Sequence, residues 1–273
     1  NRLGIVGTGV MGAGIAQIAA QASLEVALFD KRDGAARAAR DGLQVTFDKL
    51  VSKGKLSRES AEVALAHLFV VDSMTALADC DLVIEAIVED LGIKQALFSE
   101  LEAIVARDCI LVTNTSSLSV TAIGADLACP DRLAGFHFFN PVPLMKVIEV
   151  IGGIDTDETV IDTLLNLADR LGHTGVRAQD TPGFIVNHAG RAYSTEGLKI
   201  LEERVAPPED IDRILHEEAG FRMGPLELFD LTGLDVSHPA MESIFEQFYH
   251  DPRYRPSSIS RQMLNGNRLG RKT

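Results

Sequence analysis

The chain has 273 residues, a length that fits one large domain or two modest ones. It carries 26 Lys and Arg against 39 Asp and Glu, a formal net charge of −13, and it is 46% hydrophobic and 24% charged. This composition indicates a globular protein and argues against nucleic acid or a membrane surface as a partner, because both favour a basic footprint. The three scattered cysteines do not suggest a disulfide framework, so we expect a reducing, cytoplasmic location.

The first half of the chain alternates short apolar runs with longer amphipathic segments. Strands are predicted at Leu3–Gly7, Glu25–Asp30, Leu68–Val71, Asp81–Ala86 and Ile110–Thr113. Helices are predicted between them at Gly12–Ala22, Asp33–Val51, Ser57–Ala66 and Asp90–Ala106. Short runs of Val, Ile and Leu are typical of strands that are buried on both faces of a parallel sheet. The alternation therefore predicts a doubly wound α/β fold.

The pattern changes at Asp180-Thr181-Pro182-Gly183. Before this segment, we predict strands at Leu133–Phe138 and Lys146–Ile151, a helix at Asp157–Leu171 and a strand at Thr174–Ala178. After it, a long helix is predicted at Phe184–Arg204, and further helices are predicted to begin at Pro207, Gly224-Pro225 and Pro239. We therefore expect an α/β domain over residues 1–181 and an all-helical domain over residues 182–273.

A glycine-rich loop joins the first predicted strand to the first predicted helix. Its sequence, Gly7-Thr8-Gly9-Val10-Met11-Gly12, has the spacing G-x-G-x-x-G. Gly7 allows a tight turn, Gly9 lets the backbone approach a pyrophosphate, and Gly12 lets the helix pack closely on the strand. The helix N-terminus also offers free N–H groups to phosphates. The whole loop, including Val10 and Met11, is therefore predicted to bind a dinucleotide.

Asp30 is predicted to choose between the two nicotinamide cofactors. It ends the second strand, 18 residues after Gly12. A carboxylate at this place can bind the ribose hydroxyls and repels a 2′-phosphate, which favours NAD over NADP. Lys31 and Arg32 follow directly, and a cation beside the ribose can accommodate that phosphate, so they weaken the preference.

Two charged side chains interrupt apolar strands near the end of the predicted sheet. His137 lies in Ala134–Phe139, and Glu149 lies in Val147–Ile151. A buried carboxylate is costly unless it is paired, and the short turn between the strands lets the two side chains meet. Taken alone, each of the two residues could equally be a buried polar side chain whose hydrogen bonds are satisfied within the core. Together they predict a general base with its orienting carboxylate.

Other candidate residues carry a weaker signal. Ser116, in Asn114-Thr115-Ser116-Ser117, either contacts a substrate oxygen or caps the helix predicted at Ser119–Ala125. Asn187 either caps a helix or contacts a ligand. A basic cluster at Lys49, Lys53, Lys55 and Arg58 either binds the phosphates of a substrate or forms a solvated helix face, and Lys94 is a similar case. The seven histidines show no metal-binding spacing, so no metal site is predicted.

Several segments make the chain resemble the 3-hydroxyacyl-CoA dehydrogenases, including the bacterial 3-hydroxybutyryl-CoA type. The resemblance covers essentially the whole chain. The sequences of several segments are most similar to the branch of the family that acts in bacterial phenylacetate degradation. The resemblance rests on Gly4–Gln17, Asp81–Glu89, Asn114–Ser117, His137–Glu149, Asp180–Asn187 and Gly224–Asp235. The resemblance implies a Rossmann-type NAD-binding domain, a helical C-terminal domain through which the chain dimerises, and oxidation of L-3-hydroxyacyl-CoA.

The resemblance also implies residue roles. His137 matches the general base and Glu149 its partner, while Ser116 and Asn187 match residues that hold the substrate. The cofactor contacts implied are Asp30, Glu89, Lys94 and Asn114, and Lys49–Arg58 matches a helical insertion near CoA. A dehydrogenase of a free hydroxy acid or sugar acid and a non-enzymatic NAD-binding relative stay as alternatives.

The sequence departs from the family after Asn187, where His188-Ala189-Gly190-Arg191 replaces bulkier apolar residues. Arg191 lies four residues after Asn187, and residues at this spacing share a helix face. We therefore hypothesise that Arg191 binds an acyl chain that ends in a carboxylate, as in 3-hydroxyadipyl-CoA. The alternative is that Arg191 pairs with an acidic neighbour such as Glu196 or crosses the dimer interface.

Overall fold

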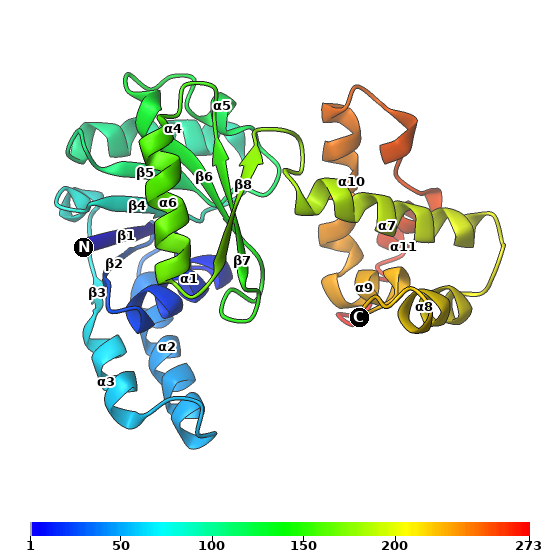
Figure 1. Cartoon of the computed structure of the whole chain (residues 1–273), viewed down its shortest axis with the longest axis horizontal. Helices are drawn as coiled ribbons and strands as arrows, with labels where there is room; N and C mark the ends of the chain where they lie inside the picture. The colour runs from blue at the N-terminus through cyan, green and yellow to red at the C-terminus, as the bar shows by residue number, and fades with distance from the viewer. Residues whose placement is uncertain (1) are drawn as a thin grey trace. The chain divides into compact units, whose positions relative to one another are not determined.

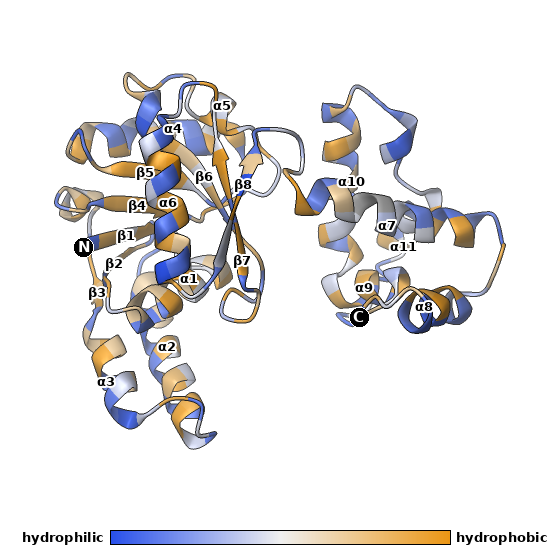
Figure 2. Ribbon diagram, in the orientation of Figure 1, coloured by the Kyte–Doolittle hydropathy of each residue, from blue (hydrophilic) through white to orange (hydrophobic). Residues whose placement is uncertain are grey.

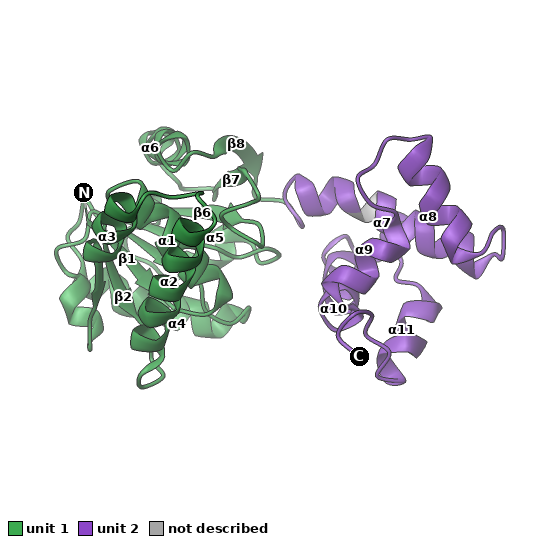
Figure 3. Ribbon diagram, turned by 90° about the horizontal axis from the view of Figure 1, so that it is seen from below, with its two compact units in different colours: residues 1–181 green, residues 182–273 purple. Residues whose placement is uncertain are grey.

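The structure is a computed structural model that describes residues 2–273, apart from the side chains of residues 191 and 192. The chain divides into two compact units, and the boundary lies between Thr181 and Pro182 (Figure 3).

Unit 1 is built on one mixed sheet. In the described residues its strands follow the order β3-β2-β1-β4-β5-β6-β7-β8. The bounds are β1 Arg2–Val6, β2 Glu25–Phe29, β3 Leu68–Val70, β4 Leu82–Glu85, β5 Ile110–Thr113, β6 Leu133–Phe138, β7 Val147–Gly152 and β8 Thr174–Gln179. Neighbouring strands are parallel except for β6 and β7, which are antiparallel. The strand order changes direction between β1 and β4, where ligands bind in folds of this kind.

Helices accompany the sheet and one pair extends away from it. The bounds are α1 Val10–Gln21, α2 Ala35–Ser52, α3 Arg58–Ala66, α4 Leu91–Ile104, α5 Val120–Ile123 and α6 Glu158–Arg170, with short 3₁₀ turns at Met74–Leu77 and Pro130–Arg132. Figure 1 shows α2 and α3 as a helical hairpin that projects from the sheet, and α6 lying along β7 and β8. Acidic or hydroxyl caps begin α3, α4 and α6 at Ser57, Asp90 and Asp157.

Alternation along the strands separates the core from the site. Ile5, Ile84, Val112, Phe136 and Val150 belong to the hydrophobic core that also contains α1 and α6 residues. Because successive side chains point to opposite faces of a sheet, the residues directly next to these core residues on the same strands point to the other face. These are Glu85, Thr113, His137 and Glu149, and all four are buried. The polar side chains that close the ends of these strands therefore gather on one face of the sheet.

Unit 2 is helical throughout its described residues. Its elements are α7 Val186–Glu202, α8 Pro208–Glu217, α9 Pro225–Thr232, α10 Leu234–Gln247, a 3₁₀ turn at Pro252–Tyr254 and α11 Ser258–Asn265. Figure 2 shows hydrophilic and hydrophobic stretches alternating along these helices, as expected for helices with one buried face. Leu198, Phe229, Leu234 and Met241 form a core between α7, α9 and α10.

The prediction that a helix begins at Pro239 is wrong. Pro239 lies inside α10, which begins five residues earlier, after Gly233 at φ +88°. Proline removes one backbone N–H but leaves the other turns of the helix in place, and this cost is tolerated where tertiary packing holds the helix. Here His238 and Met241, on either side of Pro239, are 1% exposed. The other predicted elements agree with the structure to within a few residues.

Among the described residues, none of the helices combines the length and the apolar character that crossing a membrane requires.

Candidate active site

The glycine loop between β1 and α1 has the conformation that its sequence predicts. Gly7 has φ +93°, and a Cβ there would lie 2.6 Å from the carbonyl oxygen of Ala86. A Cβ at Gly12 would overlap the carbonyl oxygen of Gly7. Gly9, by contrast, has no heavy atom within 4 Å of the position of a Cβ, so open space lies above the loop. The loop thus exposes its backbone and the N-terminus of α1, and Val10 at its tip is 74% exposed.

Asp30 closes the loop from the end of β2. Its Oδ2 accepts hydrogen bonds from the N–H and the hydroxyl of Thr8, at 2.8 and 2.9 Å. The guanidinium of Arg32 donates to both carboxylate oxygens, each at 3.1 Å. Burial would raise the pKa of Asp30, but the bonds from Arg32 and Thr8 outweigh it and hold the pKa far below the ordinary 3.8. Asp30 is therefore ionised, and Arg32 is the cation that neutralises it.

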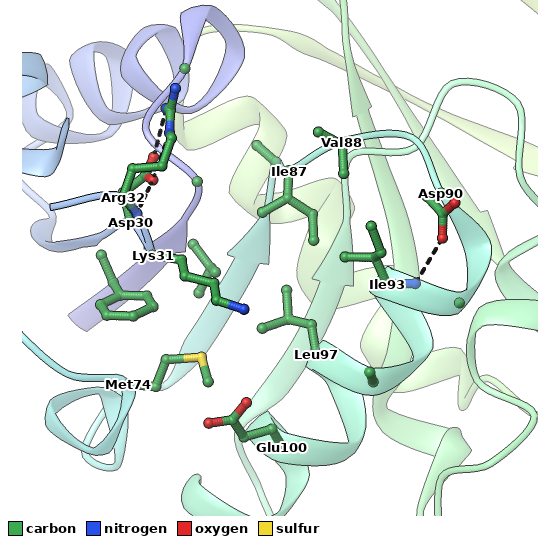
Figure 4. Close-up of a pocket in the computed structure, with 17 residues that line it drawn as sticks. Asp30, Lys31, Arg32, Met74, Ile87, Val88, Asp90, Ile93, Leu97 and Glu100 are labelled. Atoms are coloured by element: carbon green, nitrogen blue, oxygen red, sulfur yellow. Dashed lines mark hydrogen bonds and ion pairs between the residues drawn. The ribbon is translucent and has the colours of Figure 1, made fainter.

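A pocket of about 1010 Å³ opens beside Asp30. Figure 4 shows Lys31 and Arg32 at one side of it, Met74 and Glu100 at the bottom, and Ile87, Val88, Ile93 and Leu97 opposite. Its walls are mainly apolar with charged groups at the rim, and its volume suits an organic ligand. Gly7 and Gly9 belong to the same lining. The glycine loop, the ionised Asp30 and this pocket together fit the adenosine and pyrophosphate of a dinucleotide.

His137 and Glu149 form a buried pair on the adjacent strands β6 and β7. The antiparallel register places them directly opposite each other, and Nδ1 of His137 lies 2.7 Å from Oε2 of Glu149. The side chains are 5% and 1% exposed. In the tautomer with the proton on Nδ1, this nitrogen donates to the Glu149 carboxylate, and Nε2 is the nitrogen that can act as a base. The pair therefore has the arrangement of a general base with a carboxylate that orients it.

Residues 114–117 follow β5 and are organised around Glu89. Its Oε1 accepts the hydroxyl of Thr115 at 2.6 Å, the N–H groups of Ser116 and Ser117 at 2.9 and 3.1 Å, and the hydroxyl of Ser117 at 3.0 Å. The Ser116 hydroxyl is farther away, at 3.4 Å. Asn114 turns the other way, and its Oδ1 accepts the N–H of Phe138, next to His137. The loop is thus connected to the strand that carries the histidine.

Lys94 lies beneath this loop. Its Nζ is 2.5 Å from Oε1 of Glu85 and 3.3 Å from Oε2 of Glu89, and its side chain is 1% exposed. A direct contact of Lys94 with the cofactor stays a prediction. Glu85 was not among the residues predicted from the sequence, although it ends the apolar run Leu82–Ile84. This is the same signal that identified Glu149.

Asp180 is a second residue that the sequence analysis did not single out. It lies just before the boundary between the units, and its carboxylate receives hydrogen bonds from the N–H groups of Val120 and Thr121 and from the Ser119 hydroxyl, at 2.8–2.9 Å. Ser119 caps α5 as well. The cap that the sequence left open for Ser116 is therefore made by Ser119 and Asp180.

The remaining candidates belong to other elements: the α2–α3 hairpin of unit 1 and helix α7 of unit 2. Lys49, Lys53, Lys55 and Arg58 are exposed along the α2–α3 hairpin, and Arg58 pairs with Asp48 at 2.6 Å. Asn187 lies in unit 2, in the first turn of α7. The side chain of Arg191 lies outside the described residues. In the described part of the chain, no three His, Cys, Asp or Glu side chains come together as metal ligands would.

Comparison with known proteins gives matches along the whole chain. Residues 2–181 match the family "3-hydroxyacyl-CoA dehydrogenase, NAD binding domain", and residues 183–273 match "3-hydroxyacyl-CoA dehydrogenase, C-terminal domain". The chain is 45% identical over 269 residues to the 3-hydroxyadipyl-CoA dehydrogenase of Escherichia coli, covering 98% of this chain but 57% of that protein. This chain therefore spans little more than half of that relative.

Two further relatives are covered almost completely. The 3-hydroxybutyryl-CoA dehydrogenase of Clostridioides difficile is 38% identical over 272 residues, which is 100% of this chain and 96% of that protein. The crystal structure of (S)-3-hydroxybutyryl-CoA dehydrogenase from Ralstonia eutropha is similar with a TM-score of 0.96 and 36% identity, covering 99% of this chain and 95% of that one.

Proposed function

The chain belongs to the 3-hydroxyacyl-CoA dehydrogenase family of NAD-dependent oxidoreductases, and we propose that it oxidises the C3 hydroxyl of an L-3-hydroxyacyl-CoA to the 3-oxo group. The buried His137–Glu149 pair is the observation that carries this proposal, because it supplies a base of defined tautomer in the unit that carries the glycine loop.

In the proposed reaction, the protein accepts one proton from the substrate. Nε2 of His137 takes the proton of the C3 hydroxyl as the C–H bond at C3 breaks. Bound NAD supplies the acceptor for the hydride that leaves this carbon. Glu149 then stabilises the imidazolium through the bond to Nδ1, and the proton returns to solvent. The reverse direction uses the same groups, with the imidazolium as the acid.

The other residues receive binding roles in this proposal. The loop residues Gly7, Gly9, Val10, Met11 and Gly12 hold the pyrophosphate, Asp30 holds the adenosine ribose, and Glu89, Asn114 and Lys94 belong to the nicotinamide side. Ser116 and Asn187 contact the substrate. The exposed cations Lys49, Lys53 and Lys55 support a CoA contact, because CoA carries three phosphate groups and the chain as a whole is acidic.

An optical assay of NADH tests the activity. Purified protein should oxidise NADH with acetoacetyl-CoA and should leave free acetoacetate almost unchanged. His137→Ala, measured in parallel, controls for a contaminating dehydrogenase. Equal rates with the free acid would favour a hydroxy-acid dehydrogenase, and a protein that binds NADH without turnover would favour a non-enzymatic role.

For the acyl chain, we propose that 3-hydroxyadipyl-CoA is accepted. One relative is named for this substrate, and Arg191 follows Asn187 by one helical turn. The test compares kcat/KM for 3-hydroxyadipyl-CoA and 3-hydroxyhexanoyl-CoA in the wild type and in Arg191→Met. If the Arg191 guanidinium binds the terminal carboxylate, the ratio of kcat/KM for 3-hydroxyadipyl-CoA to kcat/KM for 3-hydroxyhexanoyl-CoA should fall in the variant. If the ratio is the same in both proteins, Arg191 does not bind the end of the acyl chain.

We also propose a cytoplasmic homodimer that forms through unit 2. Exposed apolar side chains of this unit, at Val205, Ile214, Phe221, Leu231 and Val236, support such an interface. Light scattering should give a mass near twice the 29.5 kDa of one chain. A mass of one chain at micromolar concentration would contradict the proposal.

A further inference from the structure

Three charged side chains form a chain of contacts next to the loop that carries Ser116, and two of them are buried. Glu85, at the end of β4, is 0% exposed, and Lys94, on α4, is 1% exposed. Lys94 bridges Glu85 and Glu89, and Glu89 in turn receives the hydrogen bonds of residues 115–117. We call Glu85, Lys94 and Glu89 the carboxylate–lysine bridge.

Glu85 is held rigidly at its own end of the bridge. Its Oε1 accepts the N–H of Ile87 at 2.6 Å as well as the Lys94 ammonium, and its Oε2 accepts the hydroxyl of Thr113 at 2.7 Å. The register places Thr113 directly beside Glu85 on the neighbouring strand. Because the Ile87 N–H and the Thr113 hydroxyl hold the Glu85 carboxylate in place, the position of the Lys94 ammonium that binds this carboxylate is defined as well.

The bridge also sets the charge state of Glu89. Burial would raise the pKa of Glu89, but the charge of Lys94 and the hydrogen bonds from Thr115, Ser116 and Ser117 outweigh it, and the pKa lies below its ordinary value. An ionised Glu89 can accept all of the donors that residues 115–117 direct toward it, whereas a protonated one cannot. Within this arrangement the Ser116 hydroxyl, at 3.4 Å, makes a longer contact than the Thr115 and Ser117 hydroxyls at 2.6 and 3.0 Å.

We propose that Glu85 is a positioning residue for the dehydrogenase reaction, which acts through Lys94 and Glu89 to fix the place of the Ser116 hydroxyl. The inference rests on the proposed function, in which Ser116 contacts the substrate. Thr115 and Ser117 anchor the loop to Glu89, and Ser116 between them is held by its backbone while its side chain serves the substrate. A rigid support of this kind is what a binding group needs to keep its geometry.

A double-mutant cycle between Glu85 and Ser116 tests the proposal. Glu85→Gln keeps the shape of the side chain and removes its charge, and Ser116→Ala removes the hydroxyl that the bridge is proposed to position. Alone, Glu85→Gln should lower kcat/KM for the acyl-CoA by about tenfold, with the dissociation constant of NADH within threefold of wild type. In the Ser116→Ala background the same change should cost less than twofold, because its target is already absent.

Thr156→Val is the matched control. Like Glu85, the part-buried Thr156 makes side-chain hydrogen bonds to the backbone, but its partners Gly153 and Leu133 lie at the opposite end of β6 from His137. It should leave kcat/KM near wild type. If Glu85→Gln does not fold, Thr113→Val takes its place in the cycle, because it removes one of the donors to Glu85, together with the acceptor of the Thr115 N–H, and keeps the side-chain volume.

The outcomes separate the two proposals. A wild-type protein without acyl-CoA turnover overturns the proposed function and this inference together. An active wild type in which Glu85→Gln costs the same factor with and without Ser116, or costs nothing, overturns the positioning role alone. A loss that appears only in NADH binding overturns it too, since the bridge would then act on the cofactor.

Discussion

Nδ1 of His137 and Oε2 of Glu149 lie 2.7 Å apart because β6 and β7 run antiparallel with these two residues in register. Direct cross-strand neighbours have Cβ atoms about 4.5–5.5 Å apart. At this separation the imidazole and the carboxylate are long enough to reach each other and form one hydrogen bond. The bond thus depends on the backbone of the sheet and needs no support from a flexible loop.

Loss of the imidazole should remove most of the turnover. We expect His137→Ala to lower kcat by roughly 10²–10⁴, the usual contribution of a general base, while the dissociation constant of NADH changes little. Steady-state kinetics and a fluorescence titration of NADH measure the two quantities. A variant that turns over at the wild-type rate would remove His137 from the mechanism.

Glu149→Gln should lower kcat as well, and it should change the pH profile. The amide oxygen can accept a hydrogen bond from Nδ1–H but carries no charge, so the imidazolium that forms during oxidation loses its electrostatic stabilisation. The pH dependence of kcat/KM should therefore differ between the variant and the wild type. His173→Gln serves as a control, because His173 is also buried in unit 1 but its ring nitrogens lie beside the backbone oxygens of Leu171 and Val142 and not beside a carboxylate. Profiles that overlay for wild type and Glu149→Gln would contradict the assignment.

Cofactor choice should depend on the balance between Asp30 and Arg32. Wild type should prefer NAD by about tenfold or more, since one repulsive contact with a 2′-phosphate is worth ~1.4 kcal/mol or above. Asp30→Ala should narrow the preference, and Arg32→Ala should widen it, because the carboxylate then loses the cation that neutralises it. Arg37→Ala, at an exposed arginine on α2, is the control. The measurement is kcat/KM with each cofactor, and equal values for the wild type would refute the prediction.

The stability of the protein should fall in acid through Glu89. Its folded-state pKa lies below the ordinary 4.5, so the ionised carboxylate stabilises the fold above pH 4.5, and this contribution is lost as the pH falls through the folded-state pKa. The difference in unfolding free energy between wild type and Glu89→Gln should therefore be full near pH 7 and shrink below pH 4.5. Urea unfolding at several pH values measures it, with the exposed Glu62→Gln on α3 as the control. A difference that is constant with pH would show that the charge is unimportant.

Asp180 should be needed to hold α5 in place. Asp180→Ala leaves the N–H groups of Val120 and Thr121 without their acceptor and should destabilise the protein by about 1–3 kcal/mol. Asp180→Asn keeps one acceptor oxygen and should cost less. Thermal and urea unfolding report both values, and equal stability of the alanine variant and the wild type would count against this role.

The sequence predicted the fold and the His137–Glu149 pair because both leave local signals. The fold class follows from the alternation of strands and helices, and a charge inside an apolar run is visible without a structure. Glu85 left the same signal, but its partner Lys94 lies on the next helix, and the packing of α4 against the sheet decides whether the two meet. The same holds for Asp180, whose contacts with Val120 and Thr121 join segments about 60 residues apart.

Arg32 shows a different limit. Its position two residues after Asp30 was evident, but whether its guanidinium turns toward the carboxylate or toward solvent depends on the turn that follows β2. Pro239 shows that a single strong local preference can mislead when neighbouring side chains are buried on both sides of it.

The register of β6 and β7 holds His137 opposite Glu149 independently of the exposed tip of the connection between the two strands. Residues 139–146 connect the two strands, and their tip, at Leu144 and Met145, is exposed. Insertions or replacements in this connection leave the cross-strand neighbours unchanged as long as the ladder between the strands is kept, whereas a slip of one residue would send one member of the pair to the opposite face. The exposed tip at Leu144 and Met145 can therefore vary in sequence while His137 keeps its partner, whereas the buried Val142 in the same connection cannot.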